Sequence, residues 1–150
     1  MWAPVFWALL GIAAGAFVTI QAPVNAALAR GLGMPVAAAA ISFFVGAVVL
    51  ALATALFAAT QGMNLNWKAP PLWTFFAGGI LGAIFVTSTI LLAPRVGALA
   101  MVAFIITGQL VAGIVLDRLG FLGLPVHEIS PGRVAGALLL LAGAVMVRVS

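Results

Sequence analysis

The chain has 150 residues, of which 66% are hydrophobic and 5% charged, and its mean hydropathy is +1.36. This composition leaves too little polar surface to cover a water-soluble globule, so it excludes a soluble protein and predicts an integral membrane protein. The net charge of +4 comes from basic residues spread singly between apolar runs, which argues against a nucleic-acid surface, and the absence of cysteine excludes disulfides and thiolate sites.

Five apolar blocks are each long enough for the roughly 20 residues that a membrane-spanning helix needs. They fall at 4–28, 35–59, 71–92, 97–117 and 131–149. Glycines and Pro35 separate the first two, the polar segment "QGMNLNWKAPP" precedes the third, and Pro94 is expected to end the third. Ser130 and Pro131 read as an N-cap and a first helical residue for the fifth. The sequence therefore predicts an all-α protein with five transmembrane helices in a single domain, 1–150.

Glycines recur four residues apart in three of the blocks, as Gly11 and Gly15, Gly78 and Gly82, and Gly132 and Gly136. Such pairs let helix backbones approach closely in a membrane, so we interpret them as packing positions rather than substrate contacts.

The first block carries two amides and a proline near its end, in the stretch "VTIQAPVNAALAR". Gln21 and Asn25 are four residues apart and share a helix face, while Pro23 frees a backbone carbonyl one turn earlier. This pattern predicts a locally broken helix that lines a solute-binding site, with Pro23 as a gating residue. The alternative is that the two amides only form hydrogen bonds between helices.

Other polar and aromatic side chains within the later blocks extend the predicted substrate-binding set. Gln109 lies near the middle of the fourth block, and Gly113 and Asp117 follow it on the same face. Asp117, next to Arg118, is more typical of an ion pair at a helix end than of a proton carrier. The remaining candidates are Ser42, Phe43, Thr87 and Phe104. Of the adjacent hydroxyls of Thr87, Ser88 and Thr89, at least two are expected to bond to their own helix carbonyls instead, and Ser42 has the same alternative.

The only histidine, His127, adjoins Glu128 in the longest loop, with no second potential metal ligand close to them in sequence. A solvated loop explains this pair better than a metal site or an acid–base pair. The chain also lacks phosphate-cradling loops and nucleophile motifs, so we predict neither an enzyme nor a cofactor.

Five helices put the basic residues equally on the two sides of the membrane. Lys68, Arg118 and Arg133 fall on one side, and Arg30, Arg95 and Arg148 fall on the other. An even distribution gives no positive-inside bias, so the chain is expected to insert in both orientations. Two copies would then pair antiparallel into ten helices, which is the inverted-repeat arrangement of many transporters.

Three stretches resemble the YdcZ-type five-helix branch of the drug/metabolite transporter superfamily. They are "GAFVTIQAPVNAALA", "GGILGAIFVTSTILLAPRVGA" and "GQLVAGIVLDRLGFLGLPVHEISPGRVAGALLLLAGAVMV", and together they cover nearly the whole chain. The resemblance implies a multi-pass transporter of small molecules in the inner membrane. The more distantly similar small multidrug exporters bind cations with a glutamate in the first helix, whereas Gln21 and Asn25 stand at that depth here, so proton-for-cation exchange is not carried over.

The sequence thus predicts an alternating-access transporter that works as an antiparallel homodimer in the lipid bilayer. Without a charge inside the spans, its small-molecule substrate is expected to be neutral or weakly polar. Two other classes stay open: an accessory membrane subunit that transports nothing itself, and a passive channel.

Overall fold

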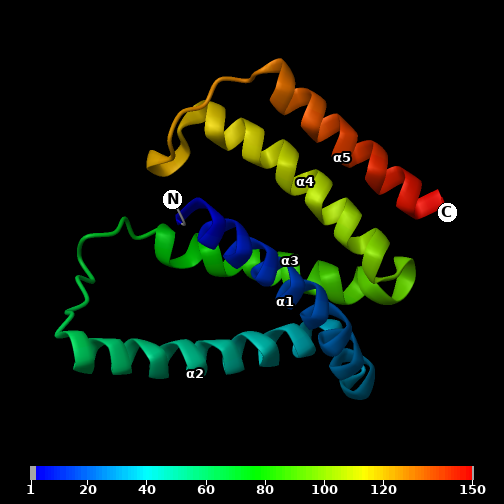
Figure 1. Cartoon of the computed structure of the whole chain (residues 1–150). Helices are drawn as coiled ribbons and strands as arrows, with labels where there is room; N and C mark the ends of the chain where they lie inside the picture. Colours follow the sequence, from blue (N-terminus) through cyan, green and yellow to red (C-terminus); the bar gives the residue numbers. More distant parts are fainter. Residues whose placement is uncertain (1–2, 150) are drawn as a thin grey trace. The chain divides into compact units, whose positions relative to one another are not determined.

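The computed structural model describes residues 3–149, with the side chains of residues 4–146, and this part of the chain is helical without strands. In chain order the elements are α1 (Ala3–Leu32), α2 (Pro35–Gln61), α3 (Thr74–Val96), α4 (Ala98–Leu119), the short 3₁₀ helix η1 (Phe121–Gly123) and α5 (Pro131–Val149) (Figure 1). The prediction of an all-α chain is confirmed, and each of the five predicted apolar blocks is a helix. The side chain of Arg148, which the charge count used, lies outside the described residues.

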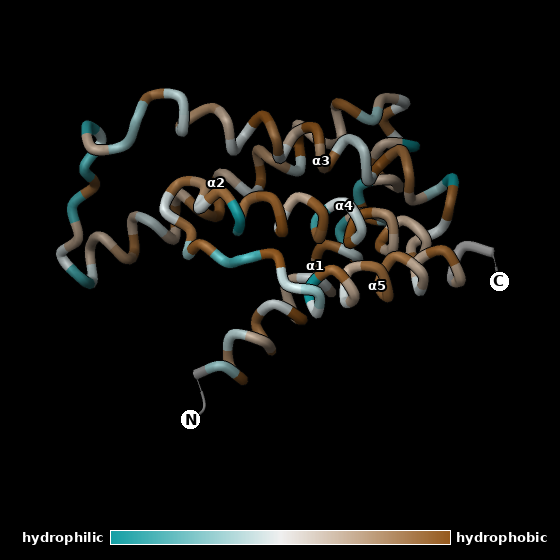
Figure 2. Tube along the Cα trace, turned by 90° about the horizontal axis from the view of Figure 1, so that it is seen from above, coloured by the Kyte–Doolittle hydropathy of each residue, from teal (hydrophilic) through white to brown (hydrophobic). Residues whose placement is uncertain are grey.

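Four of these helices are long and apolar enough to cross a membrane, among the described residues. They are α1 to α4, and the described apolar part of α5, Pro131–Met146, is shorter. In Figure 2 the helices are mainly hydrophobic and the connections between them are more hydrophilic. The long connection between α2 and α3 shows this most clearly. Length and composition therefore support at least four spans.

The helix ends follow from local backbone chemistry. Gly62 and Gly120 adopt left-handed conformations, with φ of 64° and 59°, and end α2 and α4. At the start of α5, the backbone N–H of Arg133 donates to Ser130 Oγ at 3.3 Å, which confirms Ser130 as the N-cap and Pro131 as the first residue.

Two predictions about proline are wrong. Pro94 does not end the third helix, since α3 continues to Val96, and Pro23 does not interrupt α1, which is helical from Ala3 to Leu32. A proline removes only its own N–H, so the bonds of the neighbouring residues can hold the helix together at the loss of one hydrogen bond. After Pro94, the guanidinium of Arg95 donates to the Leu91 carbonyl at 2.6 Å and supports the last turn. The gating role of Pro23 stays a prediction.

The chain divides into two compact units, Met1–Arg95 and Val96–Ser150, called the first and second units. That the two form a single domain stays a prediction. In the first unit, α1, α2 and α3 meet in a small apolar core of Ala29, Ala38, Ala39, Val86 and Ile90, with Phe85 packed against it. Three of these six side chains are methyl groups, which lets the helix backbones approach closely.

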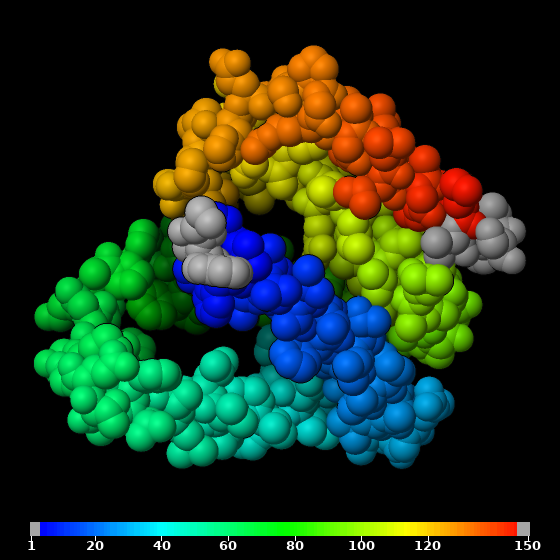
Figure 3. Space-filling model, in the orientation of Figure 1, coloured from blue at the N-terminus to red at the C-terminus, as the bar shows by residue number. Residues whose placement is uncertain are grey.

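Away from this core, Phe43 of α2 also lies against Gly82 of α3. A Cβ on Gly82 would lie 3.0 Å from the Cζ atom of Phe43, so the ring of Phe43 lies directly over this glycine. No neighbour lies within 4 Å of the Cβ positions of Gly11, Gly15, Gly78 or Gly136. The structure therefore confirms the packing interpretation for Gly82 alone. Figure 3 shows a hollow between the later half of α2 and α1, so α2 packs mainly through its first half.

In the second unit, α4 and α5 lie side by side and run in opposite directions (Figure 1). The connection between them is held to the end of α4, because the backbone N–H of His127 donates to the carbonyl of Asp117 at 3.0 Å. An ion pair between Asp117 and Arg133 joins the end of α4 to the start of α5.

Candidate functional site

Three of the predicted substrate-binding residues meet in one cavity of the first unit. Gln21 of α1 and Ser42 and Phe43 of α2 line a space of about 300 Å³, called here the α1–α2 cavity. Its remaining wall consists of Gly46, Ala47 and Leu50. Ser42, Gly46 and Leu50 are spaced by four residues, so a single face of α2 forms most of this wall. The cavity combines apolar walls with one amide and one hydroxyl group.

Asn25 plays a different part from Gln21, although the two share a helix face. The Asn25 side chain is 5% exposed, and its Nδ2 donates to Ser42 Oγ at 3.2 Å. This is the hydrogen bond between helices that the alternative interpretation expected. Asn25 therefore ties α1 to α2 and holds the Ser42 hydroxyl at the cavity, while the exposed Gln21 amide has no such role.

The α3 candidate Thr87 does not line this site. Thr87 is half-buried and is not among the residues lining the α1–α2 cavity. Its neighbour Thr89 is 4% exposed and donates to the Val86 carbonyl of its own helix at 2.8 Å, as the second reading of these hydroxyls expected. The contribution of α3 is Gly82, which supports the Phe43 ring from outside.

Gln109 lies in a separate cavity of about 350 Å³ in the second unit, called here the α4–α5 cavity. Gln109, Gly113 and Asp117 line it together, so the predicted face of the fourth helix exists. On the opposite side α5 contributes Arg133 and Gly136, and the apolar lining consists of Leu110, Ile114, Ala137 and Leu140. Small residues on both helices leave the space open.

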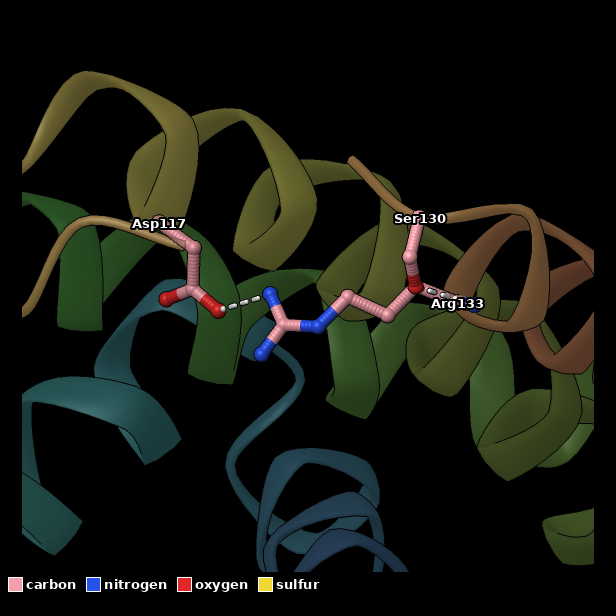
Figure 4. Close-up of polar contacts among 3 residues, drawn as sticks. All are labelled: Asp117, Ser130 and Arg133. Carbon is pink, nitrogen blue, oxygen red and sulfur yellow. Dashed lines mark hydrogen bonds and ion pairs between the residues drawn. The ribbon is translucent and has the colours of Figure 1, made fainter. Parts of the chain in front are cut away.

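Asp117 forms the helix-end ion pair that its position suggested, but with a different partner from the adjacent Arg118. Arg133 Nη1 lies 3.0 Å from Asp117 Oδ2, and the two side chains are 39% and 35% exposed (Figure 4). The hydrogen bond that Ser130 Oγ accepts from the Arg133 backbone N–H fixes the first turn of α5, from which the Arg133 side chain extends toward Asp117 (Figure 4). Neutralisation of both charges in one pair leaves Gln109 as the uncharged polar group of this cavity.

The structure separates residues that the sequence grouped together. Gln21 and Gln109 lie in different cavities, one in each unit, and Phe104, which is 45% exposed, lines neither of them. Sequence reasoning missed Arg133 as a cavity residue, although the opposite charges of Asp117 and Arg133 on either side of one loop were a usable signal. His127 and Glu128 are exposed, and no group of three metal-ligating side chains occurs among the described residues.

Comparison with known proteins gives two matches. Residues 6–146 match the family model DMT_YdcZ, described as "Putative inner membrane exporter, YdcZ". Over 75 residues the chain is 35% identical to "Inner membrane protein YdcZ" of Escherichia coli (strain K12). The aligned segment covers half of this chain and spans about half the length of that relative. No solved structure matches.

These matches and the long apolar helices agree on location: the chain is a multi-pass protein of the inner membrane. They also agree with the resemblance carried by the stretches at the beginning, middle and end of the sequence. Because the family model covers nearly the whole chain, the chain belongs to the YdcZ-type DMT family of inner membrane proteins.

Proposed function

We propose that the chain is a transporter that moves a small, neutral or weakly polar solute across the inner membrane. The observation that carries the proposal is the presence in each unit of an apolar-walled cavity containing one uncharged glutamine, Gln21 in the first and Gln109 in the second. Volumes of about 300 and 350 Å³ lie at the lower end of the range typical of small-molecule sites. The family description, an exporter, supports the same function.

The polar groups of the cavities favour an uncharged solute. The α1–α2 cavity contains no ionisable residue, and the two charges in the α4–α5 cavity neutralise each other. A permanently charged solute would lose its hydration without gaining a counter-charge, which is costly in such surroundings. An amide side chain offers both donors and acceptors and suits hydroxyl, carbonyl or amide groups on a neutral solute.

We propose further that the working unit is an antiparallel homodimer that operates by alternating access. With 19 residues, α5 is about 28 Å long at 1.5 Å per residue, close to the thickness of the hydrocarbon core, and would be a fifth span. Five spans with three basic residues on each side lack an orientation signal, so both orientations would be made. Two oppositely inserted copies would supply the paired repeats around a shared path.

The test of solute binding uses the purified full chain and a panel of neutral solutes, with the thermal unfolding midpoint as the readout. A solute that stabilises the parent protein should bind Gln21→Leu or Gln109→Leu more weakly by about 0.5–1.5 kcal/mol. Leucine has a volume similar to that of glutamine but lacks the amide that would form the hydrogen bond. Gln61→Leu is the matched control, because Gln61 is exposed at the end of α2 and lines neither cavity. Equal binding by all three variants would place the solute outside both cavities, and a parent protein that no solute stabilises would favour the accessory-subunit alternative.

Orientation is tested with C-terminal reporters that are active on one face of the membrane only. Both reporters should give a signal from the same sequence if the chain inserts in two orientations. A signal from one face alone would remove the antiparallel homodimer while leaving solute binding intact.

A further inference from the structure

A third cavity, of about 460 Å³, lies in the first unit at the end where α1 and α3 finish and α2 begins. Arg30 of α1 and Arg95 of α3 both line it. Its inner wall contains Ala26, Ala29 and Ile90, which are 3%, 7% and 2% exposed. This space, called here the arginine cavity, shares no residue with the α1–α2 cavity.

The two guanidinium groups have no carboxylate to pair with in their own unit. The only acidic residues of the chain are Asp117 and Glu128, so residues 1–95 contain none. Arg95 uses one nitrogen to donate to the Leu91 carbonyl, and Arg30 forms no hydrogen bond or ion pair with the side chains and backbone that the structure describes. Most of the donors of both groups therefore remain available.

The start of α2 adds partial positive charge to the same cavity. Gly33 and Pro35 belong to its lining, and Pro35 is the first residue of α2. The preceding residue, Met34, makes no side-chain cap, so the N–H groups of Val36 and Ala37 in the first turn of this 27-residue helix have no capping acceptor, while the Ala38 N–H donates to the Met34 carbonyl. The positive end of the α2 dipole therefore lies at this cavity beside the two arginines, whose charges offset the negative ends of α1 and α3 there.

The presence of arginines at these helix ends alone has a simpler explanation, because basic residues in the last turn of a helix interact favourably with its carbonyls. Arg95 does so through Leu91. Arg30 also lies in the last turn of its helix, α1, but it makes no hydrogen bond to the carbonyls there, and the uncapped start of α2 beside it is not explained in this way. Both arginine side chains are exposed, so an anion can reach them from outside the unit.

We propose that Arg30, Arg95 and the start of α2 bind one phosphate-type anion. Arginine forks match phosphate oxygens in a bidentate manner, and two forks with free helix N–H groups suit a group with several oxygens. The cavity lies at helix ends, where lipid headgroups meet a spanning bundle, and basic pockets of this kind bind anionic headgroups. The anion is therefore either the headgroup phosphate of an anionic lipid or free phosphate.

The experiment measures thermal unfolding of the full chain, purified in a neutral detergent, during separate titrations. The probes are short-chain phosphatidylglycerol, short-chain phosphatidylcholine and inorganic phosphate. We expect phosphatidylglycerol to stabilise the protein at lower concentrations than phosphatidylcholine. Stabilisation by inorganic phosphate as well would indicate that the free anion is recognised, and stabilisation by the lipid alone would indicate that the headgroup is the ligand. Both results support the site.

Variants locate the binding. Arg30→Gln and Arg95→Gln should each raise the half-saturating concentration about tenfold, the effect of losing one charge-assisted contact. Lys68→Gln removes the same charge from the same unit but lies outside the cavity, so it should change that concentration less than about twofold. An equal loss in Lys68→Gln, or no stabilisation of the parent by either anion, would overturn the proposal.

The lysine variants cover the case in which a glutamine variant does not fold. Arg30→Lys and Arg95→Lys keep the charge and lose the planar fork, so they should bind the anion measurably more weakly than the parent. Parent-like binding by both lysine variants would also contradict the site as described.

Discussion

The contact between Gly82 and Phe43 provides a sharp test of how α3 supports the α1–α2 cavity. Replacing Gly82 by alanine places a methyl group 3.0 Å from Phe43 Cζ and 3.3 Å from Cε1. Ordinary carbon–carbon contacts begin at about 3.5 Å, so the ring has to move by a few tenths of an ångström. Phe43 lines the cavity, and this movement therefore changes the solute-binding wall.

The size of the effect follows from the freedom of the ring. Overpacking a rigid core by one methyl group typically costs about 1–3 kcal/mol. Phe43 is 39% exposed, so its ring can partly yield, and we expect a loss near 1 kcal/mol at the lower end of that range. Gly78→Ala is the matched control, since it lies one helical turn earlier in the same glycine pair and no neighbour lies within 4 Å of its Cβ position.

Chemical or thermal unfolding of the two alanine variants in the same detergent measures the difference. Gly82→Ala should be less stable than Gly78→Ala, and Phe43→Leu should remove most of that difference when combined with Gly82→Ala, because the end of the ring is then absent. If both glycine variants unfold at the same point, Phe43 does not rest on Gly82 and the proposed support of the cavity by α3 is wrong.

Two further predictions concern hydroxyl groups that hold helices. Ser42→Ala leaves the buried Asn25 amide without its acceptor and should lower stability by about 1 kcal/mol, whereas Thr54→Ala in the same helix, whose hydroxyl donates only to the Leu50 carbonyl, should change unfolding little. Ser130→Ala removes the N-cap of α5 and should cost about 1 kcal/mol, with faster hydrogen exchange at the Arg133 amide as its local signature; unchanged exchange there would refute the capping role.

The sequence predicted the elements well because membrane spans impose strong constraints. Every backbone group in the hydrocarbon region needs a partner, so long apolar runs become helices, and glycine or a Ser-Pro pair marks their ends. The same constraint explains why the predicted helix breaks at the two prolines were wrong. In such surroundings a helix keeps its remaining hydrogen bonds, so α1 and α3 run through Pro23 and Pro94.

The candidate site could be predicted only in part, since helical periodicity orders residues on one helix and says little about its neighbours. The face of Gln109, Gly113 and Asp117 was available from spacing, and so was the shared face of Gln21 and Asn25. Which amide binds its neighbour and which faces a cavity depends on the position of Ser42 in α2, and that position is set by packing. The partner of Asp117 depends likewise on how α5 returns along α4.

The charges show most clearly what the fold adds to the sequence. A count of residues gives six basic side chains and two acidic ones, and the predicted five-span topology would divide the basic ones evenly between the two sides of the membrane. In the second unit, Arg133 finds Asp117 within the chain, so that its cavity is electrically balanced. The first unit has no acidic residue, yet it places Arg30 and Arg95 in one cavity. This concentration of unpaired positive charge in one cavity is the reason for proposing that an anion from outside the chain binds there.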